Sequence, residues 1–143
     1  YIESYLAHYS GVDSYMKNVV EKANADGYVE TMFGRRRNLP ELTSSKHMIR
    51  AFGERVARNM PIQGTAADII KIAMIKVDER MKAENLRARL VLQVHDELIV
   101  EAPQDESMRV ALIVQEEMEN AVKMSVPLTA DAAIGRTWYD AKG

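Results

Sequence analysis

The sequence predicts an α+β fold in which a small antiparallel sheet, with one clear hairpin, packs against several helices. Strand-like and helix-like segments are mixed without the regular strand–helix–strand order that builds a parallel sheet. The clearest strand pair lies within residues 89–101 and is a hairpin, which indicates an antiparallel sheet. The chain has 143 residues, 47% of them hydrophobic, and this is enough for one domain with a buried core.

The first 27 residues predict two helices. Residues 1–9 carry apolar side chains at helical spacing, and Ser10 with Gly11 predicts a break after them. Asp13 has a side chain suited to cap a second helix. Gly27 predicts the end of that helix, because glycine takes the positive φ of a helix C-terminus at no steric cost.

A short hairpin and two more helices are expected next. Residues 28–39 have the pattern of two strands joined at a glycine. A helix capped within residues 43–45 is expected to end at Pro61, because proline lacks the N–H that a helix interior needs. Thr65 and Asp68 match a capping box, which predicts the start of a second, longer helix.

The remaining chain predicts a second hairpin, a helix and a last strand. Residues 89–94 and 98–101 are rich in apolar and β-branched side chains, and residues 95–97 form the turn between them. Asp105 is suited to cap a helix whose apolar positions repeat at helical spacing. Residues 126–134 are expected to form a final strand.

Composition excludes several classes of protein. The sequence has no cysteine, which excludes disulfides and thiolate metal sites and suits a reducing cytoplasm. No stretch approaches the roughly 18 apolar residues that a membrane span needs, and no secretory signal is present. The first residue is tyrosine and not methionine, which indicates a fragment or a processed chain.

Charge is unevenly distributed along the chain. Residues 33–60 contain seven Lys or Arg and two Glu, a local charge of +5, whereas residues 93–120 contain one Arg and eight Asp or Glu, a local charge of −7. A basic segment suits a polyanion and an acidic one suits a cation. The alternative is that both are ordinary solvated faces, since surface charge is cheap to carry.

Two carboxylates, Asp96 and Glu97, fall at the predicted turn of the second hairpin. Adjacent carboxylates on a stiff turn can hold a hard divalent ion such as Mg²⁺. Asp is also common at turns for conformational reasons alone, so an ordinary acidic turn remains an alternative. The neighbouring His95, taken alone, is more often a packed or hydrogen-bonded residue than a ligand.

A row of polar side chains marks the helix expected before Pro61. Arg55, Asn59 and Gln63 are four residues apart, which places them on one face of an unbroken helix, although Pro61 is expected to bend that line. Arg suits phosphates, while Asn and Gln can bond the acceptors that every base pair presents in the minor groove. Further positive charge comes from the side chains of Lys46, Arg50 and Arg58 and from residues 35–37. The alternative is a surface helix without a ligand.

Three stretches of sequence, taken together, resemble the family A DNA polymerases and in particular the bacterial polymerase I group. The first is GYVETMFGRRRNLP at residues 27–40, and the second is ERVARNMPIQGTAADIIK at residues 54–71. The third is QVHDEL at residues 93–98, followed by IVE. The resemblance extends over the whole chain, through GRTW at residues 135–138.

This resemblance implies part of a right-hand polymerase. Residues 1–45 correspond to the last part of the fingers subdomain and residues 46–143 to the C-terminal part of the palm. Motif C corresponds to residues 94–97. In that family, the residue that corresponds to Asp96 binds the catalytic Mg²⁺ pair, and the residue that corresponds to Glu97 assists at the metal site. The residue that corresponds to His95 lies beside the primer terminus. The residues at Arg55, Asn59 and Gln63 contact the primer–template minor groove.

The implied function is that of a DNA polymerase I, which adds deoxynucleotides to a primer 3′-hydroxyl during replication and repair. The expected partners are primer–template DNA and deoxynucleoside triphosphates, in the bacterial cytoplasm near the nucleoid. The family's motif A and nucleotide-binding helix are expected upstream of Tyr1, so the fragment alone is predicted to be inactive. A non-catalytic duplex-binding module and a structural domain are the alternatives. A homodimer through exposed palm surface is also expected.

Overall fold

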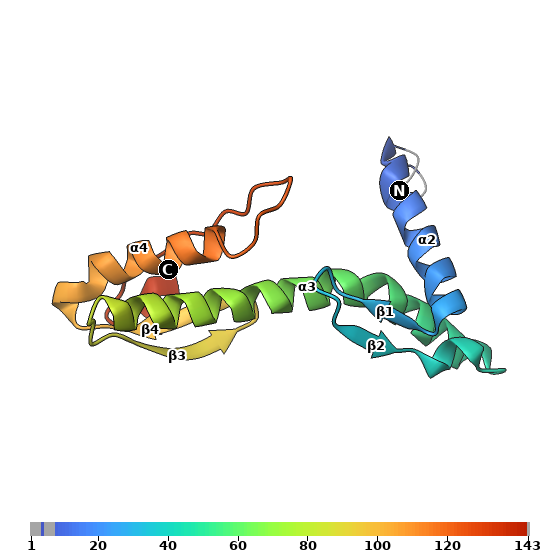
Figure 1. The fold of residues 1–143 in the computed structure, drawn as a ribbon, viewed down its shortest axis with the longest axis horizontal. Helices are drawn as coiled ribbons and strands as arrows, with labels where there is room; N and C mark the ends of the chain where they lie inside the picture. Colours follow the sequence, from blue (N-terminus) through green and yellow to red (C-terminus); the bar gives the residue numbers. More distant parts are fainter. Residues whose placement is uncertain (1–3, 5–7, 143) are drawn as a thin grey trace. The chain divides into compact units, whose positions relative to one another are not determined.

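The structure, a computed structural model, describes residues 4 and 8–142 and confirms the α+β fold. Its residues fall into two compact units, 1–65 and 66–143, and the long helix α3 (His47–Ala83) contributes to both (Figure 1). Each unit contains one two-stranded antiparallel sheet. No helix within these described ranges is both long and apolar enough to cross a membrane.

Helix α2 (Ser10–Asp26) opens the first unit, and its start differs from the prediction. The helix runs through Ser10 and Gly11, and Tyr9 occupies the N-cap position. Asp13 does not cap the helix but lies in its first turn, where its carboxylate pairs with Lys17 at 3.0 Å. A serine and a glycine are tolerated here because first-turn N–H groups lack helical partners in any case. The helix predicted for residues 1–9 lies mostly outside the described residues.

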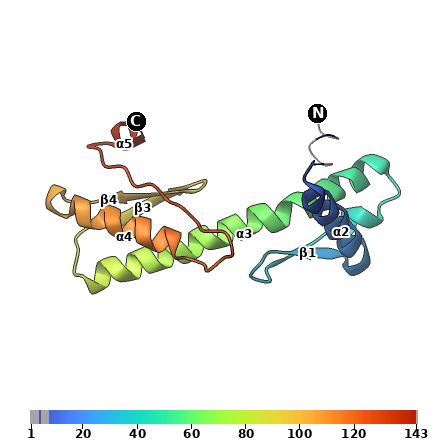
Figure 2. The ribbon, with the colours of Figure 1, turned by 90° about the horizontal axis from the view of Figure 1, so that it is seen from above.

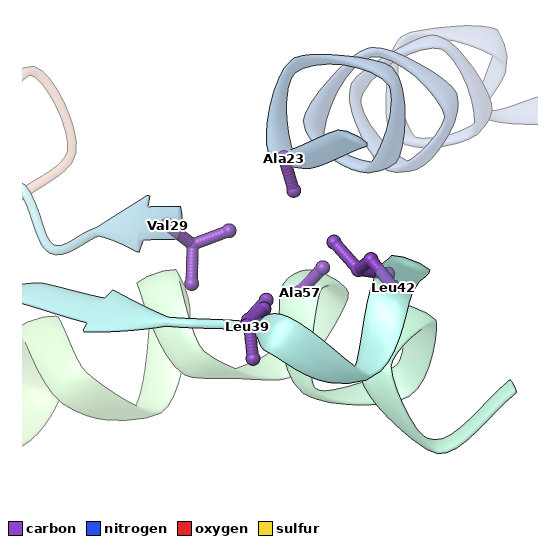
Figure 3. Close-up of a cluster of buried hydrophobic side chains, with 5 residues drawn as sticks. All are labelled: Ala23, Val29, Leu39, Leu42 and Ala57. Atoms are coloured by element: carbon purple, nitrogen blue, oxygen red, sulfur yellow. The ribbon is translucent and has the colours of Figure 1, made fainter. Parts of the chain in front are cut away.

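Strands β1 (Tyr28–Glu30) and β2 (Arg36–Asn38) form the predicted first hairpin. Gly27 ends α2 with a φ of 80°, as the sequence predicted. The short helix η1 (Pro40–Thr43) follows and leads to α3. One cluster of buried apolar side chains joins α2, the hairpin, η1 and α3, and these side chains point toward one another in Figure 3: Ala23, Val29, Leu39, Leu42 and Ala57.

Helix α3 is continuous through Pro61, so the predicted stop at this residue is wrong. Proline inside a helix removes one hydrogen bond and costs about 3 kcal/mol, which tertiary contacts must offset. One such contact involves Thr65, which does not begin a new helix. Its hydroxyl donates to the carbonyl oxygen of Pro61 and accepts a hydrogen bond from the backbone N–H of Met32 at 2.9 Å. The helix is therefore held against the first hairpin at the point where proline weakens it.

Strands β3 (Arg89–Val94) and β4 (Glu97–Glu101) form the predicted second hairpin, in the second unit. The register pairs Leu92 with Ile99 and Leu90 with Val100, so Val91 is an extra residue that forms a β-bulge. Helix α4 (Ser107–Glu119) and the C-terminal half of α3 lie alongside this hairpin (Figure 2). Their shared buried cluster consists of Val77, Met81, Ala88, Val110 and Ile113.

An ion-pair network joins α3 to α4. The guanidinium of Arg80 contacts carboxylate oxygens of Glu84 at 3.3 Å, Glu116 at 2.6 Å and Glu117 at 3.3 Å. Glu84 also accepts hydrogen bonds from Arg109 at 2.6 and 2.8 Å. The bond from Arg109 lowers the pKa of Glu84 most, and Arg80 lowers it further.

Two predictions for the C-terminal part are wrong. Glu106, and not Asp105, precedes α4 as its N-cap after the short helix η2 (Gln104–Glu106), and Asp105 pairs with Arg87 at 3.0 Å instead. Residues 126–134 form no strand in the structure and lead to the short helix α5 (Trp138–Lys142). A β-strand requires a neighbour for its backbone N–H and C=O groups, and among the described residues of this unit only β3 and β4 form a sheet.

Candidate nucleic-acid interface and acidic turn

A basic cleft lies in the first unit, between the β1–β2 hairpin and one face of α3. Its volume is about 640 Å³. Three consecutive arginines line it from the hairpin side, and polar and apolar residues line it from the helix side: Arg35, Arg36, Arg37, Phe52, Arg55, Val56, Asn59, Met60, Gln63 and Gly64. The cleft thus contains side chains that suit both phosphates and base edges.

The predicted row of Arg55, Asn59 and Gln63 lies on one face of α3 and lines the cleft. The expected bend at Pro61 does not separate Gln63 from the other two, because the helix is unbroken. All three side chains are exposed, and none makes a hydrogen bond or an ion pair with another described residue. Their donors and acceptors are therefore available to a ligand in the cleft.

The three hairpin arginines differ in what they contact. Arg35 donates to the carbonyl oxygen of Gly64 at 3.2 Å. Arg36 pairs with Glu30 at 2.8 Å and lies over the ring of Tyr28, 4.2 Å from its centre. Arg37 is exposed and has no such partner among the described residues. Arg37 is therefore the hairpin arginine whose charge is least engaged within the protein.

The close approach of hairpin and helix depends on Gly64. A Cβ at this position would lie 2.8 Å from the Cγ2 methyl of Thr31 and 3.4 Å from an Nη2 of Arg35. Thr31 is buried, and its hydroxyl accepts hydrogen bonds from the N–H groups of Phe33 and Arg35. Only a residue without a side chain fits here, so Gly64 helps to set the width of the cleft.

The other predicted DNA-binding residues do not line the cleft. Lys46 precedes α3 and is exposed, and Arg50 donates to the carbonyl oxygen of Ser44 at 3.5 Å. Arg58 lies on α3 and is half-buried. Their contact with DNA stays a prediction. The prediction missed Phe52, although its spacing of three residues before Arg55 placed it on the same helical face.

The acidic turn joins β3 to β4 in the second unit. The last pair of the ladder is Val94 with Glu97, and the chain reverses over His95 and Asp96. His95 has a φ of 53°, a left-handed conformation that is uncommon for residues other than glycine. The side-chain amide of Gln93 donates to the His95 carbonyl oxygen at 2.6 Å and supports this conformation. His95, Asp96 and Glu97 are all exposed.

Asp96 and Glu97 have the oxygen ligands that a hard divalent ion such as Mg²⁺ prefers. Neither carboxylate makes a hydrogen bond or an ion pair within the part of the chain that the structure describes. Across that same part, no group of three or more acidic or histidine side chains lies close enough to hold a metal. The two carboxylates of the turn can therefore supply some, but not all, of the ligands of a metal ion. Both carboxylates also line a groove of about 690 Å³ with β4, α4 and residues 129–142.

The sequence and the structure of this chain are both similar to those of known proteins. The family model for DNA polymerase family A matches residues 1–140. The chain is 54% identical to DNA polymerase I of Bacillus caldotenax and to that of Geobacillus stearothermophilus, over 142 residues that make up 99% of this chain. It is similar, with a TM-score of 0.95 and 47% identity, to the POL domain of Pol1 from M. smegmatis in complex with DNA primer-template and dNTP. It covers 16% of the length of those two relatives and 25% of the solved chain.

Proposed function

This chain belongs to DNA polymerase family A, and on that premise we propose that it is part of a DNA-directed DNA polymerase that extends a primer 3′-hydroxyl with deoxynucleotides. The observation that carries the proposal is the basic cleft, where Arg55, Asn59 and Gln63 have no partners among the described residues. The similar M. smegmatis domain was solved with primer-template DNA and a dNTP. Primer–template DNA and deoxynucleoside triphosphates are the proposed partners of the longer protein.

The cleft is proposed to hold the duplex without reading its sequence. Arg55 and the hairpin arginines provide positive charge for phosphates. Asn59 and Gln63 carry amide groups that can donate to the acceptors present on every base pair in the minor groove. A polymerase must accept any sequence, and this combination of charges and amides meets that requirement. Lys46, Arg50 and Arg58 are proposed to add contacts with phosphates outside the cleft.

The acidic turn is proposed to form part of the metal site. Asp96 would hold a Mg²⁺ ion and Glu97 would assist, since both carboxylates are exposed and lack partners among the described residues. Bound divalent ions supply charge neutralisation for phosphoryl transfer. The left-handed backbone of His95 fixes the direction of the turn, and its imidazole is proposed to lie beside the primer terminus.

The 143-residue chain alone is proposed not to extend primers. The described residues bring together only the two adjacent carboxylates of the turn, and no third acidic side chain joins them. Positioning of a triphosphate on two ions requires a more complete set of ligands. A binding module without catalysis is the less favoured alternative, because the family and the named relatives are DNA polymerases.

We also propose a subdomain assignment, a location and an oligomeric state for the longer protein. Residues 1–45 are assigned to its fingers and residues 46–143 to its palm. Its place is the bacterial cytoplasm, near the nucleoid. Self-association of the chain is proposed because several large apolar side chains, among them Met108 and Tyr139, are exposed. Sedimentation over a range of concentrations tests this, and a constant monomer mass would contradict it.

The binding proposal is tested by fluorescence anisotropy of a labelled DNA duplex. The chain should bind at low salt, and the logarithm of its affinity should fall linearly with the logarithm of salt concentration. Arg55→Ala should weaken binding and reduce that slope by about one. Lys71→Ala is the matched control on the same helix, and a smaller effect is expected because Lys71 is exposed but neither lines the cleft nor belongs to the proposed phosphate contacts. Absence of binding by the unaltered chain at low salt would refute the proposal.

A further inference from the structure

Phe52 is an apolar lining residue of the basic cleft that the core of its unit does not explain. The other apolar residues of the cleft, Val56 and Met60, pack against the buried cluster of the first unit. Phe52 is not part of that packing, and 43% of its surface is exposed. Its ring therefore offers the cleft an apolar surface, and a ligand that covered this surface would gain from its burial.

The position of Phe52 on α3 relates it to the proposed duplex contacts. It precedes Arg55 by three residues and Asn59 by seven, and these spacings place all three on one helical face. Arg55 suits phosphates, and Asn59 suits base edges in the minor groove. Each phosphate of a strand joins two sugars, so a side chain beside Arg55 on this face would lie next to a sugar when Arg55 binds a phosphate. A deoxyribose offers a C–H surface there, and this is the surface that a phenyl ring can cover.

We propose that Phe52 contacts the sugars of the bound duplex and makes the cleft select deoxyribose over ribose. The inference rests on the proposed function, because it requires a nucleic-acid duplex in the cleft. A ribose carries a 2′-hydroxyl in the minor groove. A phenyl ring against that hydroxyl would remove its water without offering a hydrogen bond, which is unfavourable. The same ring against deoxyribose covers only apolar surface.

The experiment compares a DNA duplex with an RNA–DNA hybrid of the same sequence, using fluorescence anisotropy and the 143-residue chain. The unaltered chain should bind the DNA duplex more tightly. Phe52→Ala should weaken binding of the DNA duplex by about tenfold, from the loss of apolar contact area, and should weaken hybrid binding far less. Its salt slope should not change, because a phenyl ring releases no counterions. Phe52→Leu should retain most of the selectivity.

Two controls and the opposing outcomes make the test specific. Ile62→Ala removes another exposed apolar side chain of α3 that does not line the cleft, and it should change neither affinity. Circular dichroism establishes that each variant is folded. If the unaltered chain binds but Phe52→Ala leaves the ratio of the two affinities unchanged, the inference fails alone. If the unaltered chain binds no duplex at low salt, the proposed function fails and the inference fails with it.

Discussion

The hydroxyl oxygen of Thr65 accepts a hydrogen bond of 2.9 Å from the backbone N–H of Met32, which joins helix α3 to the first hairpin across 33 residues of sequence. The same hydroxyl donates to the carbonyl oxygen of Pro61. One side chain therefore compensates part of the disturbance that proline causes in the helix and holds one wall of the basic cleft.

Thr65→Val should lower the free energy of unfolding by about 1 kcal/mol, since valine keeps the shape of threonine but removes both hydrogen bonds. Urea unfolding measures the change. Thr65→Ser retains the hydroxyl and should recover most of the lost stability. Equal stability of the valine variant and the unaltered chain would show that the hydroxyl contributes nothing.

Gly64→Ala sets two effects against each other. Alanine is favoured over glycine in a helix by about 1 kcal/mol, but its Cβ would lie 2.8 Å from a methyl of the buried Thr31. Overpacking of this kind costs about 1–3 kcal/mol, so we expect a net loss of stability and weaker duplex binding.

Gly11→Ala in α2 is the matched control for that substitution. Apart from its chain neighbours and its own helix backbone, no atom lies within 4 Å of the added Cβ. When the thermal unfolding of both variants is measured, Gly11→Ala should therefore be unchanged or slightly more stable than the unaltered chain. A Gly64→Ala variant that gains as much stability as Gly11→Ala would contradict the close approach of hairpin and helix.

Acid should weaken the link between α3 and α4 through Glu84. Hydrogen bonds from Arg109 and Arg80 lower the pKa of this carboxyl in the folded chain below its ordinary value of 4.5. Its contribution to stability is therefore fully present above pH 4.5 and is lost as the pH falls through the lower folded value. Glu84→Gln should flatten the dependence of the unfolding midpoint on pH in this acidic range.

Glu119→Gln is the control for that experiment, because Glu119 lies on α4 but makes no ion pair within the described residues. It should leave the acidic part of the stability curve almost unchanged. Identical curves for the Glu84→Gln and unaltered chains would exclude the proposed role of Glu84.

Asp96→Ala, made in the longer polymerase proposed above, should abolish primer extension and largely spare duplex binding. The proposed reason is that Asp96 holds metal, whereas phosphates and base edges are bound in the cleft. Extension assays and anisotropy measure the two properties separately. Glu101→Gln, at the far end of β4, should retain extension. Extension by the Asp96→Ala protein at the rate of the unaltered enzyme would contradict the role.

The sequence correctly predicted the parts of the fold that depend on residues close together in the chain. Gly27 ends α2, and alternating apolar residues with turn residues gave both hairpins. The spacing of Arg55, Asn59 and Gln63 also predicted their shared face. Each of these features depends on residues only a few positions apart.

Several of the wrong predictions concern partners that are distant in sequence. Pro61 remains within α3 in the presence of contacts such as the one between Thr65 and the Met32 amide, and no local pattern predicts that contact. Residues 126–134 have the composition of a strand, but they pair with neither strand of the β3–β4 sheet. The cleft itself required the hairpin to be placed against α3, so its lining could not be read from spacing alone.

The bulge in the second hairpin has a consequence at the level of the gene. Val91 is the surplus residue of β3, with Leu90 opposite Val100 and Leu92 opposite Ile99 on either side of it. An in-frame loss of codon 91 would leave both pairs intact and turn the hairpin into an uninterrupted ladder. Asp96 and Glu97 would keep their places in the register, but the hairpin would lose the bend and added twist that a bulge introduces, so codon 91 contributes to the direction in which the turn presents these carboxylates.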